Sequence, residues 1–245
     1  MNILGVDVSA FTMEQAVKIG DDMLNSGKNS VVFTPNPEII WSAGRNERLK
    51  SALDSADLLL PDGIGVVIAS KILGNPLPER VAGYDFLHKI LELCADEGKK
   101  VYLLGSAEGV AEKAAENLKK QYQNLQIAGT HHGYFTQEDE PRIIKEIRDS
   151  GASLLVVCLG APKQEIWIAE NRDKTAVSMA IGVGGALDVI AGNVRRAPIA
   201  WQKSGFEWLY RAICQPSRIP RLVAIPKFML AVTWSRIRNS KEKTG

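Results

Sequence analysis

Short apolar segments alternate with longer amphipathic segments along most of this sequence. The apolar segments predict strands at residues 3–8, 31–33, 58–60, 101–106, 127–129, 154–159 and 178–183. The amphipathic segments place apolar residues on one helical face and predict helices at 13–24, 38–53, 64–73, 84–95, 108–122 and 142–148. This alternation indicates βαβ units, so we expect an α/β fold with a Rossmann-like, mainly parallel sheet flanked by helices.

Composition places the chain among soluble globular proteins, with 45% hydrophobic and 24% charged residues in 245. The three cysteines are far apart and form no metal or disulfide pattern, which favours a reducing, cytoplasmic setting. The first residues are too short and too acidic for a signal peptide. No run of about 18 uncharged apolar residues occurs, so no membrane-spanning helix is expected.

Charge divides the chain into two parts near residue 195. Residues 195–245 carry 11 Lys and Arg and two acidic residues, a net charge of +9. Residues 1–194 carry 19 Lys and Arg and 26 acidic residues, a net charge of −7. We therefore expect a catalytic domain at 1–194 and a basic appendage at 195–245 that meets an anionic partner.

The appendage is also rich in tryptophan and in helical patterns. One predicted helical face carries Trp201, Gly205, Trp208, Leu209, Ala212 and Ile213, and Pro220 and Pro226 are expected to interrupt a second amphipathic stretch at 219–238. Basic residues, tryptophans and broken amphipathic helices favour an interfacial membrane contact. The alternative is a helical subdomain that packs on the body or on another subunit.

Polar residues and glycines follow several of the predicted strands. They are Thr34 and Asn36, Asp62, Gly105 and Ser106, the segment 160–167, and the segment 182–185. Because the carboxyl ends of parallel strands meet at one edge of a sheet, we expect the active site at that edge.

Two charged residues near this edge are candidates for chemistry. Asp62 lies between Pro61 and Gly63, and a carboxylate held there can serve as a general base; an ordinary turn or helix cap is the alternative. Arg80 can bind a diphosphate through charge-assisted hydrogen bonds, or it can be a solvated loop arginine.

The segment 160–167 indicates a tight turn between a buried strand and a helix. Pro162 suits the first helical turn, and Lys163, Gln164 and Glu165 would then lie at a ligand crevice. An ordinary βα loop with a solvated helix start is the alternative.

The segment 182–188 resembles a phosphate-binding turn, because glycines let backbone N–H groups approach an anion. It lacks the glycine spacing of a dinucleotide fingerprint, and the chain has no Walker-type motif. His88, His131 and His132 have no zinc-like companions, and the chain has no Asp-x-Asp pair, so nothing requires a metal. Residues 131–135 either line a cleft or form a loop.

Two other protein classes fit the sequence less well. An NAD-dependent oxidoreductase needs a glycine fingerprint in its first βα turn, and residues 3–12 do not supply one. A nucleic-acid-binding protein would use the basic tail, but that function leaves Asp62, Gln164 and the glycine turns without a role.

Five motifs occur in order along the chain and together carry a family resemblance. They are Thr34-Pro35-Asn36-Pro37-Glu38, Pro61-Asp62-Gly63-Ile64-Gly65, Glu79-Arg80-Val81-Ala82-Gly83-Tyr84-Asp85, Gly160-Ala161-Pro162-Lys163-Gln164-Glu165-Ile166-Trp167, and Gly182-Val183-Gly184 continuing to Arg195-Arg196-Ala197-Pro198. The chain resembles the WecG/TagA/CpsF glycosyltransferases, glycosyltransferase family 26. The segments 207–211 and 215–218 resemble the basic C-terminal appendage of that family, so the likeness covers nearly the whole chain.

The resemblance implies an inverting, metal-independent transfer from a UDP-sugar without a cofactor. Asp62 would be the general base. Substrate would meet Thr34, Asn36, Arg80, Gln164, Arg211, Arg218 and Arg221, and UDP would meet Gly105, Ser106, Pro162, Lys163, Glu165, Gly182, Gly184, Gly185 and Asp188.

Within the family the chain is most similar to the N-acetylmannosamine transferases of wall teichoic acid linkage-unit synthesis. The implied donor is UDP-N-acetylmannosamine, and the acceptor is N-acetylglucosamine on undecaprenyl diphosphate at the cytoplasmic membrane face. UDP-N-acetylmannosaminuronic acid and UDP-glucose stay open as donors, as does a homo-oligomer. No nucleic-acid partner is expected.

Overall fold

The computed structural model describes residues 1–214 and 222–242. Its centre is a six-stranded sheet in the order β4-β3-β8-β7-β5-β6, in which every neighbouring pair is parallel. The strands are β3 (Ser30–Phe33), β4 (Leu58–Leu59), β5 (Lys100–Gly105), β6 (Gln126–His131), β7 (Leu154–Cys158) and β8 (Met179–Gly182). The expected α/β fold with a mainly parallel sheet is confirmed.

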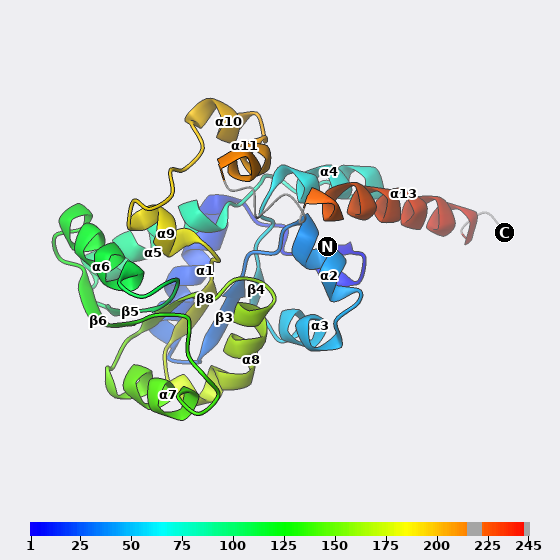
Figure 1. The fold of residues 1–245 in the computed structure, drawn as a ribbon. Coiled ribbons are helices and arrows are strands. Elements are labelled where there is room, and N and C mark those ends of the chain that lie inside the picture. The colour runs from blue at the N-terminus through cyan, green and yellow to red at the C-terminus, as the bar shows by residue number, and fades with distance from the viewer. Residues whose placement is uncertain (215–221, 243–245) are drawn as a thin grey trace.

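Helices cover both faces of the sheet (Figure 1). They are α1 (Met13–Ser26), α2 (Pro37–Ala43), α3 (Glu47–Asp54), α4 (Ile64–Leu73), α5 (Gly83–Asp96), α6 (Val110–Gln121), α7 (Glu140–Asp149), α8 (Lys163–Thr175), α9 (Ala186–Ile190), α10 (Ile199–Lys203), α11 (Glu207–Cys214) and α13 (Ala224–Glu242).

Strand residues alternate between two apolar cores, one on each face of the sheet. In β3, Val32 packs in the core formed with α1, α5, α6 and α9, whereas Val31 and Phe33 pack in the core formed with α2, α3, α4, α7, α8 and α13. Successive side chains of a strand point to opposite faces, so a strand covered on both sides is apolar throughout. This is why the apolar segments of the sequence identified the strands of the sheet.

The N-terminal segment differs from the predicted strand at 3–8. It forms an antiparallel hairpin of β1 (Asn2–Ile3) and β2 (Val6–Asp7), apart from the central sheet. Leu4 and Gly5 both have positive φ, 50° and 90°, as a tight two-residue hairpin turn requires. The chain therefore reverses within the apolar segment, and the prediction of a single strand was wrong.

The predicted helix at 38–53 is two helices, α2 and α3, with a break at residues 44–46. Asn46 starts the second helix, because its side-chain oxygen accepts a hydrogen bond of 3.0 Å from the backbone N–H of Leu49. Helix capping by Asn competes with continuation of the first helix, which explains the break.

The appendage also differs from its predicted pattern. Trp201 and Trp208 lie on separate short helices, α10 and α11, because Gly205 between them has a φ of 80°. Pro226 lies in the first turn of α13 and does not interrupt that helix, since a helix start leaves the backbone N–H of its first residues unpaired.

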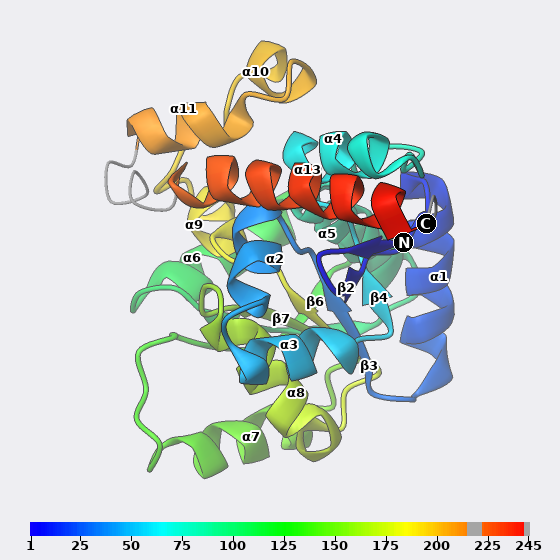
Figure 2. The ribbon, with the colours of Figure 1, turned by 90° about the vertical axis from the view of Figure 1, so that its right-hand side faces the viewer.

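Helix α13 packs along α2 and α4, as Figures 1 and 2 both show. Its Phe228 and Val232 are fully buried in the core on that face of the sheet. Among the described residues, no helix has the length and apolar character needed to cross a bilayer. The division of the chain at residues 194 and 195 stays a prediction.

Candidate active site

A cavity of about 410 Å³ lies beyond the carboxyl ends of β3, β4 and β8. These strands are adjacent and parallel, so the segments that follow them begin at the same edge. The body contributes Thr34, Asn36, Asp62 and Arg80 to the cavity wall. Four predicted residues from three separate motifs therefore come together.

The tail lines the same cavity. Its lining residues are Phe206, Glu207, Trp208, Ile225 and Met229. Helices α11 and α13 thus complete a cavity that the strand ends alone would leave open. Polar and apolar side chains both line the cavity, which suits a ligand that has both kinds of surface.

Backbone hydrogen bonds fix Asp62 from both sides. Its own N–H donates to the carbonyl of Pro35 at 3.2 Å, and the carbonyl of Pro61 accepts from the N–H of Val81 at 3.0 Å. Gly63 follows with a φ of 88°, which turns the chain into α4. The half-buried Asp62 side chain is consequently carried on a rigid backbone at the cavity.

Thr34 and Asn36 follow β3, and the side chain of each makes a hydrogen bond within the protein. Thr34 is buried, and its hydroxyl donates to the carbonyl of Gly182 at 3.3 Å, which joins the ends of β3 and β8. The Asn36 side-chain oxygen caps α2 by accepting from the N–H of Ile39 at 3.0 Å. The amide nitrogen of Asn36 is then the part of this side chain that a ligand can use.

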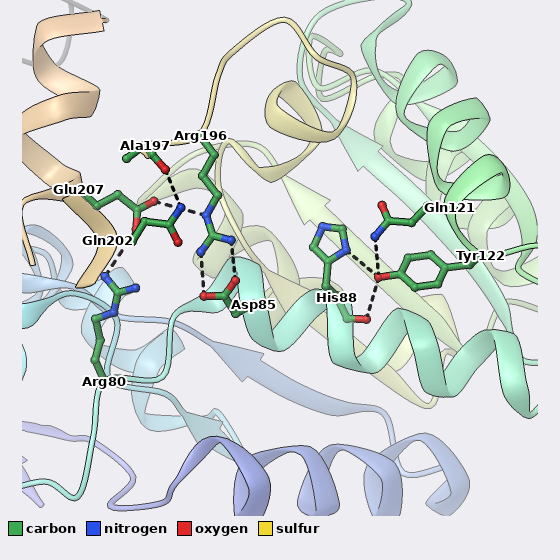
Figure 3. Close-up of polar contacts among 9 residues, drawn as sticks. All are labelled: Arg80, Asp85, His88, Gln121, Tyr122, Arg196, Ala197, Gln202 and Glu207. Atoms are coloured by element: carbon green, nitrogen blue, oxygen red, sulfur yellow. Dashed lines mark hydrogen bonds and ion pairs between the residues drawn. The ribbon is translucent and has the colours of Figure 1, made fainter. Parts of the chain in front are cut away.

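Arg80 lines the cavity from the loop between α4 and α5, and its Nη1 lies 3.5 Å from a carboxylate oxygen of Glu207. Arg196 lies nearby and makes two hydrogen bonds to the carboxylate of Asp85, at 2.6 and 2.7 Å (Figure 3). The guanidinium of Arg196 also lies 4.5 Å from the centre of the Tyr84 ring. Two arginines therefore line one side of the cavity.

Gln164 is buried behind the glycine turn and is not part of the cavity wall. Its Oε1 accepts from the N–H of Gly184 at 2.9 Å, and its Nε2 donates to Glu165 at 2.8 Å. Burial raises the pKa of Glu165, and the hydrogen bond from Gln164 opposes that rise. Gln164 holds the turn after β8 and is itself bound to Glu165. The predicted contacts of these two side chains with substrate and UDP stay predictions.

A second polar group lies farther along the sheet edge, at the ends of β5 and β7. The hydroxyl of Ser106 donates to Asp188 at 2.8 Å, and Nζ of Lys163 donates to the carbonyl of Gly133 at 3.1 Å. At Gly105, a Cβ atom would lie 2.4 Å from the carbonyl oxygen of Cys158. These predicted UDP contacts are close to one another but do not line the cavity.

Pro162 directly precedes α8, whereas the sequence places it inside the first turn. Its carbonyl accepts the hydrogen bond from Ile166, which makes it the capping residue, and the Ala161–Pro162 peptide is cis. Gly185 occupies the same position before α9. The turns after β7 and β8 therefore both lead directly into helices.

Three predicted arginines cannot be placed at the cavity. Arg211 belongs to α11, and its side chain lies outside the described part of the structure, as do residues Arg218 and Arg221 altogether. Among the described residues, no three His, Cys, Asp or Glu side chains are grouped to hold a metal ion. The contacts of these arginines and metal independence stay predictions.

Sequence reasoning missed Arg196, Glu207 and Tyr84. Arg196 lies in the motif 195–198 and Tyr84 in the motif 79–85, so both motifs carried a signal. The two motifs meet through the contact of Arg196 with Asp85, which are more than 100 positions apart in the sequence. No periodicity or local spacing indicates such a contact, because it depends on how the tail folds back over the strand ends.

Comparison with known proteins agrees with the sequence motifs. Residues 1–242 match the glycosyl transferase WecG/TagA/CpsF family. A Bacillus spizizenii protein named N-acetylglucosaminyldiphosphoundecaprenol N-acetyl-beta-D-mannosaminyltransferase is 38% identical over 209 residues, covering 85% of this chain and 80% of its own length. A Staphylococcus aureus protein of the same name is 36% identical over 245 residues, covering 99% and 96%. The chain therefore belongs to the WecG/TagA/CpsF family of glycosyltransferases.

Proposed function

We propose that this enzyme transfers N-acetylmannosamine from UDP-N-acetylmannosamine to the 4-hydroxyl group of N-acetylglucosamine on undecaprenyl diphosphate. This is the linkage-unit step of wall teichoic acid synthesis. The observation that carries the proposal is the cavity in which Asp62, Thr34, Asn36 and Arg80 converge. The names of the two relatives describe transfer of N-acetylmannosamine to N-acetylglucosaminyldiphosphoundecaprenol and support the proposed sugar and acceptor.

Asp62 is the proposed general base. Its carboxylate takes the proton of the acceptor 4-hydroxyl group while that oxygen forms a bond to the anomeric carbon of the donor. The bond from this carbon to the UDP oxygen breaks, and UDP leaves with the electron pair. Attack from the side opposite UDP inverts the configuration, and one positioned carboxylate is sufficient for this step.

Positive charge in the cavity wall supports binding of the diphosphate groups. Arg80 lines the cavity, and a guanidinium forms strong hydrogen bonds to phosphate oxygens. Arg211, Arg218 and Arg221 are proposed to add charge from the tail. The glycine turn 182–185, with Gly105, Ser106, Lys163 and Asp188, is the proposed region for UDP.

The acceptor is a lipid, so the enzyme must reach a bilayer surface. Large apolar side chains on the tail are exposed, among them Ile213, Leu230, Trp234 and Ile237. Lys227, Arg236 and Arg238 are exposed on α13 as well. Apolar and basic side chains together favour peripheral binding to the anionic inner face of the cell membrane.

The test of this function compares the parent with Asp62→Asn in sugar transfer to a lipid-diphosphate N-acetylglucosamine acceptor, with EDTA present. We expect activity in the parent and a loss of about 100-fold or more in the variant, because Asn cannot accept the proton. Asp173→Asn is the matched control, since Asp173 is exposed on α8 away from the cavity.

Equal rates in the parent and Asp62→Asn would remove Asp62 as the base. A panel of UDP-sugars addresses the donor. If the parent transferred sugar only from UDP-N-acetylmannosaminuronic acid or UDP-glucose, the proposed site would stand and the proposed donor would be wrong.

A further inference from the structure

Glu207 lies at the start of α11, buried above the cavity between two arginines. One carboxylate oxygen is 3.5 Å from Nη1 of Arg80, and the other is 4.0 Å from Nε of Arg196 (Figure 3). Charge-assisted N–H···O hydrogen bonds have optimal distances of about 2.7–2.9 Å. Glu207 is therefore placed between two cations and holds neither of these two groups at the optimal distance.

Arg196 is the fixed partner of this pair. Its two terminal nitrogens are committed to Asp85, and its guanidinium also lies against the Tyr84 ring. Its Nε is buried and donates to no acceptor within the described part of the chain. A buried donor without an acceptor is unfavourable, so Arg196 offers Glu207 an unused N–H.

Arg80 is the less constrained partner. Its contact with Glu207 is one long ion pair, and its side chain lines the cavity. An anion in the cavity would compete with Glu207 for the same guanidinium. Loss of the 3.5 Å contact with Arg80 would be offset in part if the other carboxylate oxygen of Glu207, now 4.0 Å from Nε of Arg196, moved to hydrogen-bond distance of that N–H.

We propose that Glu207 is a positioning residue that releases Arg80 to a substrate diphosphate and then binds Nε of Arg196. This inference rests on the proposed function, since it takes Arg80 as a ligand of diphosphate. In the empty cavity Glu207 holds Arg80 and offsets its charge. When a diphosphate enters, Arg80 binds it, and the α11 wall is drawn toward Arg196 and Asp85.

The first consequence concerns anion affinity. Replacing Glu207 by Gln removes a negative charge that competes with the diphosphate for Arg80. We therefore expect the full-length Glu207→Gln variant to bind inorganic pyrophosphate about fivefold more tightly than the parent in calorimetric titration. In an Arg80→Gln background, the same substitution should change the affinity by less than about twofold, because the shared partner is gone.

Two variants control for charge and for folding. Glu170→Gln also removes a carboxylate from an ion pair, with Arg48 at 2.6 Å, but on the exposed surface between α3 and α8. It should leave pyrophosphate affinity unchanged. Glu207→Asp keeps the charge and should stay within about twofold of the parent. Thermal melting of each variant identifies any loss of fold.

The second consequence concerns turnover. The acceptor keeps its diphosphate through the reaction, so tighter binding also slows product release. Glu207→Gln should lower both KM for the lipid acceptor and kcat, with both restored in Glu207→Asp. A purely structural role would raise KM or lower kcat alone, and would not depend on Arg80.

Several results would overturn the inference. They are unchanged or weaker pyrophosphate binding in folded Glu207→Gln, the same gain in the Arg80→Gln background or in Glu170→Gln, and no pyrophosphate binding by the parent. Failure of the proposed function looks different. An enzyme that does not transfer N-acetylmannosamine but shows the Arg80-dependent gain retains the Glu207 exchange with another diphosphate substrate.

Discussion

Gly83 lets the segment that carries Arg80 pass directly over Thr34. A Cβ atom at position 83 would lie 2.8 Å from the hydroxyl oxygen and the methyl carbon of Thr34. Thr34 in turn donates to the carbonyl of Gly182. The absence of one methyl group therefore brings three parts of the site together, from the ends of β3 and β8 and the start of α5.

Gly83→Ala tests this contact. We expect Thr34 to be displaced from Gly182, with a loss of about 1–3 kcal/mol in the free energy of unfolding. For a chain of this length, each kcal/mol corresponds to about 2–4 °C in Tm. The transfer rate should fall about tenfold because the strand-end geometry changes. Scanning calorimetry and the transfer assay measure both.

Gly44→Ala is the control for this substitution. Gly44 ends α2 with an ordinary helical φ of −64°, and an added Cβ would meet only Trp41 O, at an ordinary distance of 3.7 Å. This variant should keep the parent Tm and rate. If Gly83→Ala had the same Tm and transfer rate as Gly44→Ala, the Thr34 side chain could move aside without affecting stability or activity.

At the scale of elements, α13 is apolar on two sides. Phe228 and Val232 are buried against the body, whereas Leu230 and Trp234 are 72% and 70% exposed. Packing against α2 and α4 explains the first side only. The exposed side, together with the basic residues of α13, is the surface that we propose to bind the membrane.

Substitution of both Leu230 and Trp234 by Ser should weaken binding to vesicles containing anionic phospholipid by about tenfold or more. A fully buried large apolar side chain contributes roughly 1.5–3 kcal/mol, so partial insertion of two accounts for this loss. Because both side chains are exposed, Tm should not change. Vesicle sedimentation measures the binding.

Tyr134→Ser is the control for vesicle binding, since Tyr134 is 79% exposed on the loop between β6 and α7. It removes an exposed aromatic side chain far from α13 in the sequence. If the α13 double variant and Tyr134→Ser bind vesicles as the parent does, the exposed side of α13 is not the membrane surface.

At the scale of the whole molecule, the tail and the sheet share one core. Phe228 and Val232 of α13 belong to the same apolar cluster as Val31 and Phe33 of β3. A tail built in this way should unfold together with the sheet. Deleting the tail would therefore expose core residues, and point substitutions are the cleaner test of its role.

Phe228→Ala should lower the free energy of unfolding by about 3–5 kcal/mol, in one cooperative transition followed by urea titration. Leu230→Ala, two positions away and exposed, should change it by less than about 0.5 kcal/mol. A Phe228→Ala protein in which the tail melts separately, with the main transition unmoved, would show that residues 195–245 fold as an independent unit.

The layers of the fold and the polar residues that follow the strands can be predicted from the sequence. Strands and amphipathic helices can be recognised locally, because the spacing of apolar residues along the sequence shows which faces of an element are buried. Parallel strands bring the residues that follow them to one edge, so the sequence predicts Asp62, Thr34 and Asn36 at one site, and all three line the cavity. Failures of local prediction came where the chain turns inside an apolar segment, as at Leu4 and Gly5.

The choice of strand ends that form the cavity, and of the segments that close it, depends on how distant parts of the chain pack together. The ends of β5 and β7 lie at the same edge of the sheet, but their residues do not line the cavity. The side chain of Gln164 is buried and accepts a hydrogen bond from Gly184. The tail supplies Arg196 and Glu207, and these contacts link residues more than 100 positions apart. Such contacts depend on the packing of α11 and α13 against the body, which no local pattern of residues encodes.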